Sequence, residues 1–312
     1  MKSACAGGKQ LPAMTIGTVQ LGMNYGIANE SGKPDEEKSF AILKTAFENG
    51  AASLDTSPAY GDSEAVIGRF LRTWRKETPF ITTKIPVQRD RECAFESFVL
   101  SSVEGSLKRL GINKLDCVLL HGANNMFDYR GEAASAMEKL LVRGLADRVG
   151  VSLYTAEELE EMLRYPVYTA TQVPMSIFDQ RLIAGGYVRR LKEAGYTVFV
   201  RSVFLQGVFF LDPDKVTDPI LVRCAVPAIR LIRQIAAQEG MSVSQLAIAF
   251  MRDTEGVSSL VLGADNPDQV RENAAQFAAP ALAPAVRARL ERELAGVDIP
   301  EIMKVLSRPK KQ

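Results

Sequence analysis

Four side chains that can exchange protons stand at or just after the ends of apolar runs in this sequence. The only histidine, His121, directly follows the apolar run 117–120. Asp55 and Lys84 end two other short runs, and Tyr60 comes five residues after Asp55. A carboxylate, a phenol, an ammonium and an imidazole that lie together can give a proton to a substrate oxygen or take one from it. These four residues therefore form a candidate proton-transfer site.

Short apolar runs bounded by turn-forming residues are typical of buried strands. In a parallel α/β protein the ends of successive strands meet and carry the active site. Strand-like runs recur eight times, near Thr15, Ser53, Phe80, Cys117, Arg148, Ala170, Thr197 and Ser259. Because a closed parallel barrel has this number of strands, the sequence predicts an α/β protein with a single-domain (β/α)8 TIM barrel.

Helical patterns separate the strand-like runs. Thr155, with Glu158 three residues later, resembles a capping box, and Gly111 comes just after an expected helix end. The expected helices cover residues 35–49, 63–71, 92–110, 133–142, 155–163 and 186–194, with a further pair between residues 224 and 251.

The single predicted domain covers all of residues 1–312. Within it we expect an N-terminal segment (1–13), a long loop with helices after the seventh strand (202–258) and a C-terminal tail (295–312). The stretch 202–258 starts with several residues that show no helical pattern, and long loops of this kind can cover a ligand.

The composition is that of a soluble globular protein. Apolar residues make up 46% and charged residues 24% of the chain, and the net charge is +1, so we expect neither a nucleic-acid partner nor a membrane partner. The four cysteines, Cys5, Cys93, Cys117 and Cys224, form no C-x-x-C pair, so no metal site or disulfide framework is expected. Neither an export signal nor an apolar run of about 18 residues occurs, which predicts a cytoplasmic protein.

The four candidate residues also occur in the order of a known catalytic tetrad. The stretch 55–61 resembles the D-T-A-x-x-Y-G signature of the aldo-keto reductases. Further matches lie at 150–152 (GVS), at 172–174 (QVP) and at 263–273, which resembles G-x-x-x-x-x-Q-x-x-E-N. Each motif is weak alone, but together and in this order they are specific. The chain therefore resembles an aldo-keto reductase over nearly its whole length.

The resemblance implies reduction of an aldehyde or ketone with hydride from a nicotinamide cofactor. Tyr60 would be the general acid in reduction and the general base in oxidation, and the Lys84 ammonium would lower the pKa of the phenol. Asp55 would hold Lys84 charged through a buried ion pair. His121, in its neutral form, would donate a hydrogen bond to the substrate oxygen.

No G-x-G-x-x-G fingerprint occurs, so the cofactor would be held without a Rossmann site. The resemblance implies that it lies extended across the barrel mouth, with Ser152 and Gln172 at the nicotinamide carboxamide and residues 202–207 over the pyrophosphate. The residues expected to bind it are Gly17, Thr18, Val19, Asp55, Ser152, Gln172, Arg201, Ser202, Val203, Leu205, Gln206, Gly207, Gly263, Ala264, Asp265, Gln269, Glu272 and Asn273.

Two cofactors are consistent with the sequence. NADP(H) is favoured, because the family mostly prefers it and Gln269, Arg271 and Asn273 remain to bind a 2′-phosphate. NAD(H) stays open, because Asp265 stands where a small hydroxyl residue is frequent. A carboxylate there would repel a phosphate and accept a hydrogen bond from a free 2′-hydroxyl.

The sequence departs from the family pattern at two positions near the nicotinamide. Leu153 follows Ser152 where Asn or Arg is common, which puts one polar contact in doubt. Arg201 stands where many relatives have a Tyr or Trp that stacks on the nicotinamide. Its guanidinium could stack in the same way, attract an anionic substrate group or simply pair with a carboxylate, and these alternatives remain open.

Substrate contacts are the least defined part of the expected site. Tyr25, Asn124 and Phe204 are expected to bind substrate together with Tyr60 and His121. The stretch after His121 is polar, which suits a hydroxylated, sugar-like carbonyl compound, although an ordinary solvated loop fits it as well. Tyr25 and Phe204 fit a core role equally.

Two other functions are left open. The same residues would serve an NAD(P)-dependent sugar or alcohol dehydrogenase that works in the oxidising direction. Barrels of this family also act as nucleotide-binding regulatory subunits with little turnover, although the intact tetrad favours an enzyme. The sequence does not indicate an oligomeric state.

Overall fold

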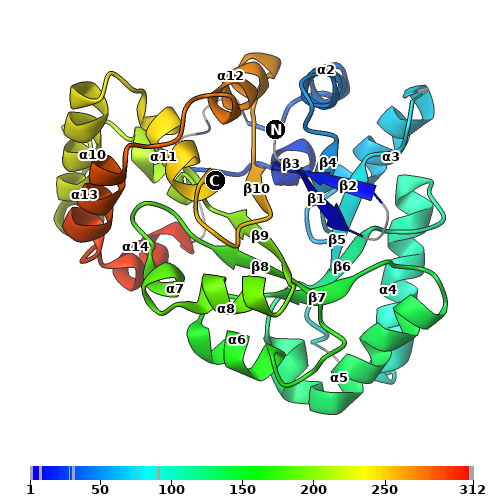
Figure 1. Ribbon diagram of the computed structural model, residues 1–312. Helices are drawn as coiled ribbons and strands as arrows, with labels where there is room; N and C mark the ends of the chain where they lie inside the picture. The colour runs from blue at the N-terminus through cyan, green and yellow to red at the C-terminus, as the bar shows by residue number, and fades with distance from the viewer. Residues whose placement is uncertain are drawn as a thin grey trace.

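Eight parallel strands close into a barrel in the order β10-β3-β4-β5-β6-β7-β8-β9, and helices surround it (Figure 1). The computed structural model describes residues 3–6, 9–27, 29, 32–74, 76–89 and 92–308. The predicted (β/α)8 TIM barrel is confirmed, and each strand-like run of the sequence forms one barrel strand. The strands are β3 (Met14–Gly17), β4 (Ser53–Asp55), β5 (Phe80–Ile85), β6 (Cys117–Leu120), β7 (Val149–Ser152), β8 (Ala170–Pro174), β9 (Thr197–Arg201) and β10 (Ser259–Leu262).

The helices mostly begin and end at the signals that the sequence carries. The Thr155 hydroxyl accepts the Glu158 N–H, which completes the predicted capping box, and Gly111 ends its helix with φ of 69°. The helices are α1 (Val19–Gly22), α2 (Glu36–Glu48), α3 (Ser63–Thr73), α4 (Phe95–Leu110), α5 (Asn124–Val142), α6 (Ala156–Met162), α7 (Arg181–Ala184), α8 (Tyr187–Glu193), α9 (Pro219–Cys224), α10 (Val226–Gln238), α11 (Val243–Arg252), α12 (Pro267–Phe277), α13 (Pro284–Leu294), α14 (Ile299–Leu306) and the 3-10 helix η1 (Leu205–Phe210).

The sequence did not predict α12 and α13, and two further segments differ from the expectation. The stretch after His121 is not a loop, because α5 already begins at Asn124, and a break at Arg130 (φ 45°, ψ −121°) divides it. The expected C-terminal tail, 295–312, contains α14. This helix forms because Ile299 and Ile302 are buried against the rest of the molecule. Ion pairs also tie it and the residues after it to α9 and the cap of α9.

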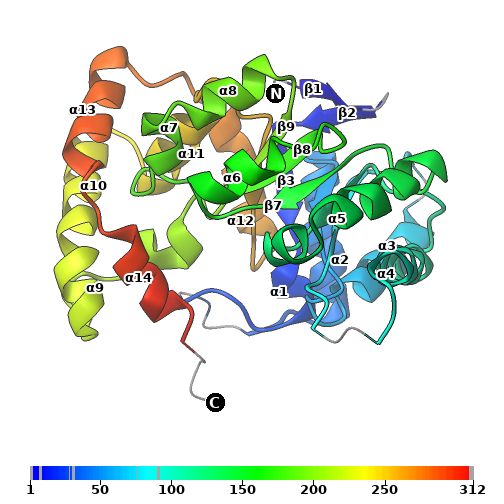
Figure 2. The same cartoon turned by 90° about the horizontal axis from the view of Figure 1, so that it is seen from below.

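An antiparallel hairpin closes one end of the barrel. It consists of β1 (Ser3–Ala6) and β2 (Lys9–Pro12). Leu11 of the hairpin belongs to a small buried cluster with barrel residues such as Phe80 and Phe199. Lys9 forms an ion pair with Asp116 at 3.1 Å. In Figure 2 the hairpin and α14 lie at opposite ends of the molecule.

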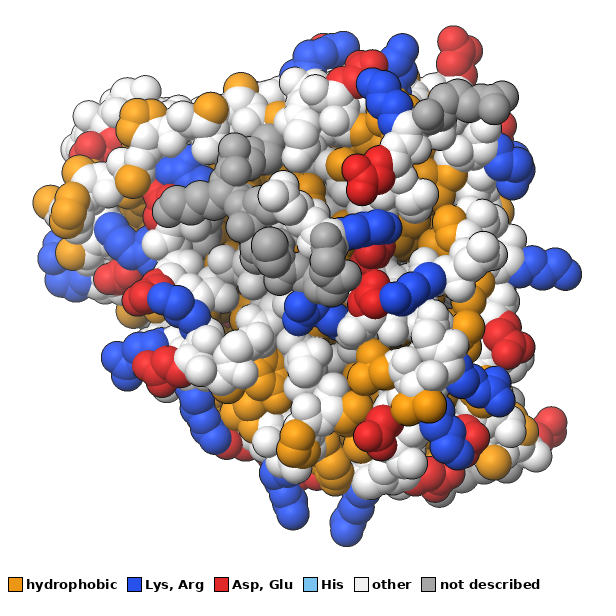
Figure 3. All heavy atoms as spheres, turned by 45° about the vertical axis from the view of Figure 1, so that its right-hand side comes forward, with side chains coloured by type: hydrophobic (Ala, Val, Ile, Leu, Met, Phe, Trp, Pro, Cys, Tyr) orange, Lys and Arg blue, Asp and Glu red, His pale blue; other side chains and the backbone are white. Residues whose placement is uncertain are grey.

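The surface carries both signs of charge. Lys and Arg side chains are interspersed with Asp and Glu over the face seen in Figure 3, as a net charge of +1 leads one to expect. In the part of the chain that the structure describes, no helix is both long and apolar enough to span a bilayer.

Candidate active site

A cavity of about 820 Å³ opens at the carboxyl ends of the barrel strands. Most of the predicted site residues line it. From the catalytic and substrate sets these are Asp55, Tyr60, His121, Tyr25 and Phe204, and from the cofactor set Gly17, Thr18, Val19, Ser152, Gln172, Arg201, Ser202, Val203, Gln206, Gly207, Gly263, Asp265, Gln269, Glu272 and Asn273.

Four predicted site residues do not line the cavity. Lys84, Leu205 and Ala264 are buried, and Lys84 contacts the cavity wall through the Tyr60 hydroxyl. Asn124 is exposed at the start of α5 and is not part of the cavity wall. The cavity wall therefore gives no support to the prediction that Asn124 contacts substrate, because the polar stretch that contains it forms a helix instead of a pocket loop.

The cavity also includes residues that the sequence analysis missed. Tyr154 comes two residues after Ser152 and could have been found from that motif. Met303 and Leu306 come from α14, where their spacing of three places both on one helix face. The other lining residues are Gln20, Gly26, Asn29, Phe210, Ser244, Val261 and Leu262.

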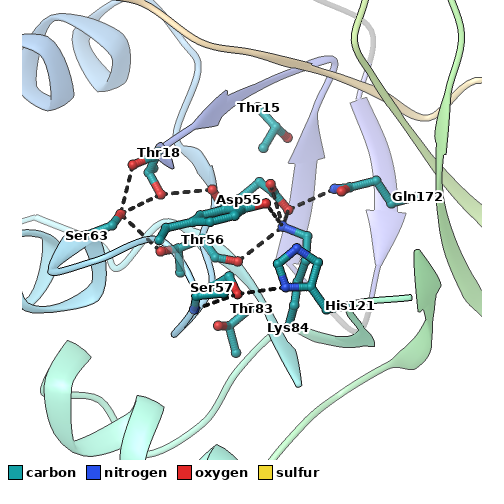
Figure 4. A network of polar contacts seen from close by, with 12 residues as sticks. Thr15, Thr18, Asp55, Thr56, Ser57, Ser63, Thr83, Lys84, His121 and Gln172 are labelled. Atoms are coloured by element: carbon teal, nitrogen blue, oxygen red, sulfur yellow. Dashed lines mark hydrogen bonds and ion pairs between the residues drawn. The ribbon is translucent and has the colours of Figure 1, made fainter. Parts of the chain in front are cut away.

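Asp55 and Lys84 form an ion pair at the floor of the cavity (Figure 4). Lys84 Nζ donates to both Asp55 carboxylate oxygens at 2.7 Å and to the Thr56 carbonyl oxygen at 3.2 Å. Both side chains are almost fully buried. Gln172 Nε2 also donates to Asp55 Oδ1 at 2.8 Å. Buried charges are tolerated only when they are paired and hydrogen-bonded in this way.

Tyr60 completes a chain of contacts from this pair into the cavity. Its hydroxyl lies 3.2 Å from Lys84 Nζ. Two glycines allow the loop of Tyr60 to pack tightly on α1. Gly61 has φ of +57°, and a Cβ there would lie 2.3 Å from the Gly22 carbonyl oxygen. A Cβ at Gly22 would lie 1.7 Å from the Tyr60 carbonyl oxygen, so neither position accepts a side chain.

The state of the Tyr60 phenol differs from the expectation. Burial raises the pKa of Tyr60 above its ordinary value, and the Lys84 ammonium lowers it by a smaller amount. The expected lowering by Lys84 is present, but the pKa of Tyr60 is still raised overall. Burial is the main reason, and the Asp55 carboxylate adds a smaller raising effect. Burial works to lower the pKa of Lys84, but Asp55 and Tyr60 together raise it, so the ammonium stays charged.

His121 lies immediately after β6, with its ring edge-on to that of Tyr60 at 5.5 Å between centroids. Burial, followed by the cations Lys84 and Arg201, lowers the pKa of His121 to about 3, so the imidazole is neutral at neutral pH.

Ser57 is a neighbour of His121 that the sequence analysis did not consider. Ser57 Oγ lies 3.1 Å from His121 Nδ1 and also accepts the Ala59 N–H at 3.1 Å. A Ser57 hydroxyl that donates to Nδ1 places the His121 proton on Nε2, from which the ring can donate to a ligand.

Arg201, at the end of β9, stacks on a tyrosine of the protein itself. Its guanidinium carbon lies 4.2 Å from the centre of the Tyr154 ring. Arg201 Nη2 is buried and has no hydrogen-bond partner among the described residues. The arginine therefore stands in the cavity wall with part of its donor capacity unused.

The cavity wall fits a nicotinamide dinucleotide. Gln172 Oε1 is a buried acceptor without a partner in the described part of the chain, as suits a residue that binds a carboxamide. Four residues of the turn after β9 have positive φ: Ser202 (62°), Leu205 (48°), Gln206 (55°) and Gly207 (96°). Turns with residues in this conformation can gather backbone N–H groups into a site for phosphate oxygens.

At the far side of the cavity, Asp265 presents a carboxylate two residues before α12 begins. Asn29 Nδ2 donates to Asp265 Oδ1 at 3.3 Å, and the Asp265 N–H donates to Gln269 Oε1 at 2.7 Å. Burial raises the pKa of Asp265 above the usual range for a carboxyl. Arg271 does not line the cavity and forms an ion pair with Asp268 on the surface.

Comparison with known proteins agrees with this arrangement. The model of the Aldo/keto reductase family matches residues 13–292. The chain is 25% identical to the L-glyceraldehyde 3-phosphate reductase of Escherichia coli (strain K12), covering 85% of this chain and 84% of that one. It is 24% identical to the NADH-specific methylglyoxal reductase of the same strain, covering 85% and 89%.

A solved structure shows the same fold. The glycerol dehydrogenase from Gluconobacter oxydans superimposes with a TM-score of 0.78 at 20% identity, covering 95% of this chain and 96% of that one. The family match spans most of the sequence and contains all four residues of the proton-transfer site. The chain therefore belongs to the aldo/keto reductase family and is an NAD(P)-dependent oxidoreductase of carbonyl compounds.

Proposed function

We propose that this enzyme reduces a small hydroxylated aldehyde or ketone, with Tyr60 as the proton donor. The observation that supports it best is a chain of hydrogen bonds that runs from Asp55 through Lys84 to the Tyr60 hydroxyl. Tyr60 and His121 line the same cavity. A cofactor bound in the cavity would supply the hydride for the carbonyl carbon.

The proton steps follow from the residues of the site. The phenol keeps its proton at neutral pH, because burial raises the pKa of Tyr60. When the carbonyl carbon is reduced, its oxygen gains negative charge, and Tyr60 gives its proton to that oxygen. The phenolate left on Tyr60 is then stabilised by the Lys84 ammonium at 3.2 Å. His121, through Nε2–H, would hydrogen-bond the same substrate oxygen and hold it in place.

The residues that would hold the cofactor follow from the cavity wall. Ser152 and Gln172 would bind the nicotinamide carboxamide. The turn 202–207 would bind the pyrophosphate through its backbone. Gln269, Glu272 and Asn273 would contact the adenosine half, next to Asp265.

We propose NAD(H) as the preferred cofactor, in place of the NADP(H) that the sequence favours. Asp265 lines the cavity, whereas Arg271, the cation expected to help bind a 2′-phosphate, points elsewhere and is paired with Asp268. Arg201 is the only Lys or Arg among the described lining residues, and it lies at the end of β9, not beside α12. Lys38, whose charge works to lower the pKa of Asp265, does not line the cavity. A free ribose hydroxyl can donate to a carboxylate, whereas a phosphate would be repelled.

An Asp265→Ser variant tests this preference. The serine removes the repulsion, so the ratio of kcat/KM for NADPH over NADH should rise by roughly tenfold or more, which is about 1.4 kcal/mol. Asp268→Ser, which replaces an exposed carboxylate in the first turn of α12, is the matched control and should leave the ratio unchanged. An unaltered ratio in Asp265→Ser would show that Asp265 does not read the 2′ position.

The substrate is expected to be small and polar. The two relatives from Escherichia coli are named for three-carbon carbonyl compounds, L-glyceraldehyde 3-phosphate and methylglyoxal. The test is a panel of aldehydes, ketones and sugars with NADH and NADPH in turn, followed by absorbance of the reduced nicotinamide. Turnover of small hydroxylated carbonyl compounds is expected, and turnover of bulky apolar ketones alone would overturn the substrate class.

The same panel run in the oxidising direction tests the alternative that the enzyme is a sugar or alcohol dehydrogenase. A dehydrogenase role would appear as faster oxidation of sugars or alcohols than reduction of their carbonyl partners at neutral pH. Cofactor binding without turnover in either direction would favour the regulatory-subunit alternative.

The cytoplasmic location expected from the sequence stays a prediction, which fractionation of cells that express the native chain would check.

A further inference from the structure

Arg201 has a position in the cavity that the proposed reaction does not explain. It is the only Lys or Arg among the described residues that line the cavity. The proton-transfer steps use Asp55, Lys84, Tyr60 and His121, and none of them requires a further cation. A positive charge in a partly enclosed site costs free energy unless something compensates it.

Within residues 3–6, 9–27, 29, 32–74, 76–89 and 92–308, no carboxylate oxygen lies within 4.0 Å of the Arg201 guanidinium. Other partly buried arginines do have such partners, for example Arg181 with Asp179 at 2.8 Å. The expectation that Arg201 simply pairs with a carboxylate is thus not met. Its Nη2 is buried without any hydrogen-bond partner in the same part of the chain.

The Arg201 guanidinium lies over the ring of Tyr154, with its central carbon 4.2 Å from the ring centroid. This contact uses the π face of the ring and no hydrogen bond from the guanidinium, so the N–H groups remain able to donate. A planar fork of donors of this kind matches the oxygens of a carboxylate or a phosphate.

Arg201 also lies at the reacting end of the cavity. It ends β9 and pairs in register with Pro174 of β8, the strand that carries Gln172. Its charge contributes to the lowered pKa of His121 and counteracts the raised pKa of Tyr60 and Tyr25. An anion bound to Arg201 would therefore be close to a carbonyl held between Tyr60 and His121.

We propose that Arg201 binds an anionic group of the substrate, so that the preferred substrates are aldehydes or ketones that carry a phosphate or a carboxylate. This inference rests on the proposed function, since it names the class of carbonyl compound that the same site reduces. Arg201 and Tyr154 together form the anion subsite, in which Tyr154 positions the guanidinium.

The test compares matched pairs of substrates. Glyceraldehyde 3-phosphate is paired with glyceraldehyde, and succinic semialdehyde with its neutral methyl ester. The measured quantity is the ratio of kcat/KM for the anionic over the neutral member of each pair. The parent enzyme should favour at least one anionic member by tenfold or more, and the pair that shows it distinguishes a phosphate from a carboxylate.

Variants assign the preference to Arg201. In Arg201→Met the ratio should fall by at least tenfold, about 1.4 kcal/mol, whatever happens to the two individual rates. Arg201→Lys should keep part of it, because the charge remains while the fork is lost. Arg189→Met, an exposed arginine on α8, is the matched control and should keep the parent ratio.

Three outcomes would overturn the proposal. The first is a parent ratio near one for both pairs while neutral aldehydes are turned over, which leaves the proposed function intact. The second is an equal loss for both members in Arg201→Met together with weaker binding of the dinucleotide, which would assign Arg201 to the cofactor. The third is that neither glycerol 3-phosphate nor 4-hydroxybutyrate binds the parent in calorimetry with NADH present, which refutes the subsite even without turnover.

The expected result of this binding experiment is that at least one of the two anions binds the parent and binds Arg201→Met at least tenfold more weakly.

Discussion

The Lys84 ammonium contacts both the Asp55 carboxylate and the Tyr60 hydroxyl. The proton that the site can give to a substrate is that of the Tyr60 hydroxyl. Lys84 donates to both residues, and the carboxylate is nearer than the phenol by about half an ångström (2.7 against 3.2 Å). Lys84 lowers the pKa of the phenol as well as pairing with Asp55, but burial outweighs this effect on Tyr60. The phenol keeps its proton until negative charge develops on a bound oxygen, as a general acid requires.

Replacement of Tyr60 by Phe should remove the proton donor and little else. We expect kcat for carbonyl reduction to fall by roughly 100- to 10,000-fold, the usual contribution of general acid catalysis, with the cofactor dissociation constant nearly unchanged. Tyr165→Phe, which removes a hydroxyl outside the cavity, is the control and should behave as the parent. If Tyr60→Phe reduces carbonyl compounds at close to the parental rate, another group supplies the proton.

Ser57→Ala should disturb His121 without changing any charge. The hydrogen bond to Nδ1 is lost, so the Nε2–H tautomer is less populated, and kcat/KM should fall by roughly tenfold, as for the loss of one hydrogen bond. The chain has one histidine, so nitrogen NMR reports its tautomer without overlap. Ser57→Thr keeps the hydroxyl and should restore both the tautomer and the rate. An unchanged spectrum in Ser57→Ala would remove Ser57 from the site.

At the scale of elements, the position of Tyr60 depends on how closely its loop approaches α1. The carbonyl of Tyr60 faces Gly22, and the carbonyl of Gly22 faces Gly61. The Tyr60 carbonyl oxygen also accepts the Ser63 N–H at 3.1 Å, which joins the loop to the start of α3. Two helices thus hold the loop that carries the proton donor.

Gly61→Ala tests this contact. The alanine adds left-handed strain of about 1–2 kcal/mol and also a clash with the Gly22 carbonyl at 2.3 Å. Gly144→Ala is the matched control, because Gly144 also has positive φ (+68°) but no atom lies within 4 Å of the added Cβ. We expect urea unfolding to show a clearly larger loss of stability for Gly61→Ala, together with reduced kcat in its folded fraction. Equal losses in the two variants would mean that the loop can yield.

The elements themselves were predictable to different degrees. The barrel strands are short apolar runs, and burial of these apolar side chains is the main reason that they form strands. All eight could be predicted from the sequence. Helix α14 was missed because its apolar residues bury only against parts of the chain that are distant in sequence. The start of α5 was missed because Asn124 and Asn125 are typical of loops, although Met126 next to them is fully buried.

At the scale of the molecule, the buried histidine makes stability depend on pH. His121 has a pKa of about 3 in the folded protein, against 6.5 for an exposed histidine. Between these values a falling pH protonates the unfolded chain but not the folded one, so stability is lost as pH falls below about 6.5. Several carboxylates add to acid unfolding, so a comparison with a variant is needed to isolate His121.

His121→Asn provides that comparison, because it removes the only histidine. Urea midpoints of the parent and the variant are measured at pH 7.5 and at pH 4.5. The parent should lose more stability over this interval, by about 1 kcal/mol, since His121 faces the cavity and solvent screens part of the shift. The same loss in both proteins would show that His121 titrates normally.

The candidate site as a whole was only partly readable from the sequence. The tetrad was found because each member stands at a strand end, where the fold alone brings them together. The stacking of Arg201 on Tyr154 and the contact of Ser57 with His121 depend on side-chain directions that spacing does not reveal. The raised pKa of Tyr60 could not be predicted, because the sequence shows that Lys84 is near but not how deeply the phenol is buried. Burial and the Asp55 carboxylate together outweigh the lowering by Lys84.

The placement of α14 has a practical consequence for handling the protein. Met303 and Leu306 form part of the cavity wall, whereas the hairpin β1–β2 lies at the opposite end. Any polypeptide that continues past α14, such as an affinity tag or a fluorescent partner, would leave from beside the substrate chamber. A fusion on the hairpin side keeps its bulk away from the chemistry, so kinetic constants are best compared between proteins tagged at that end.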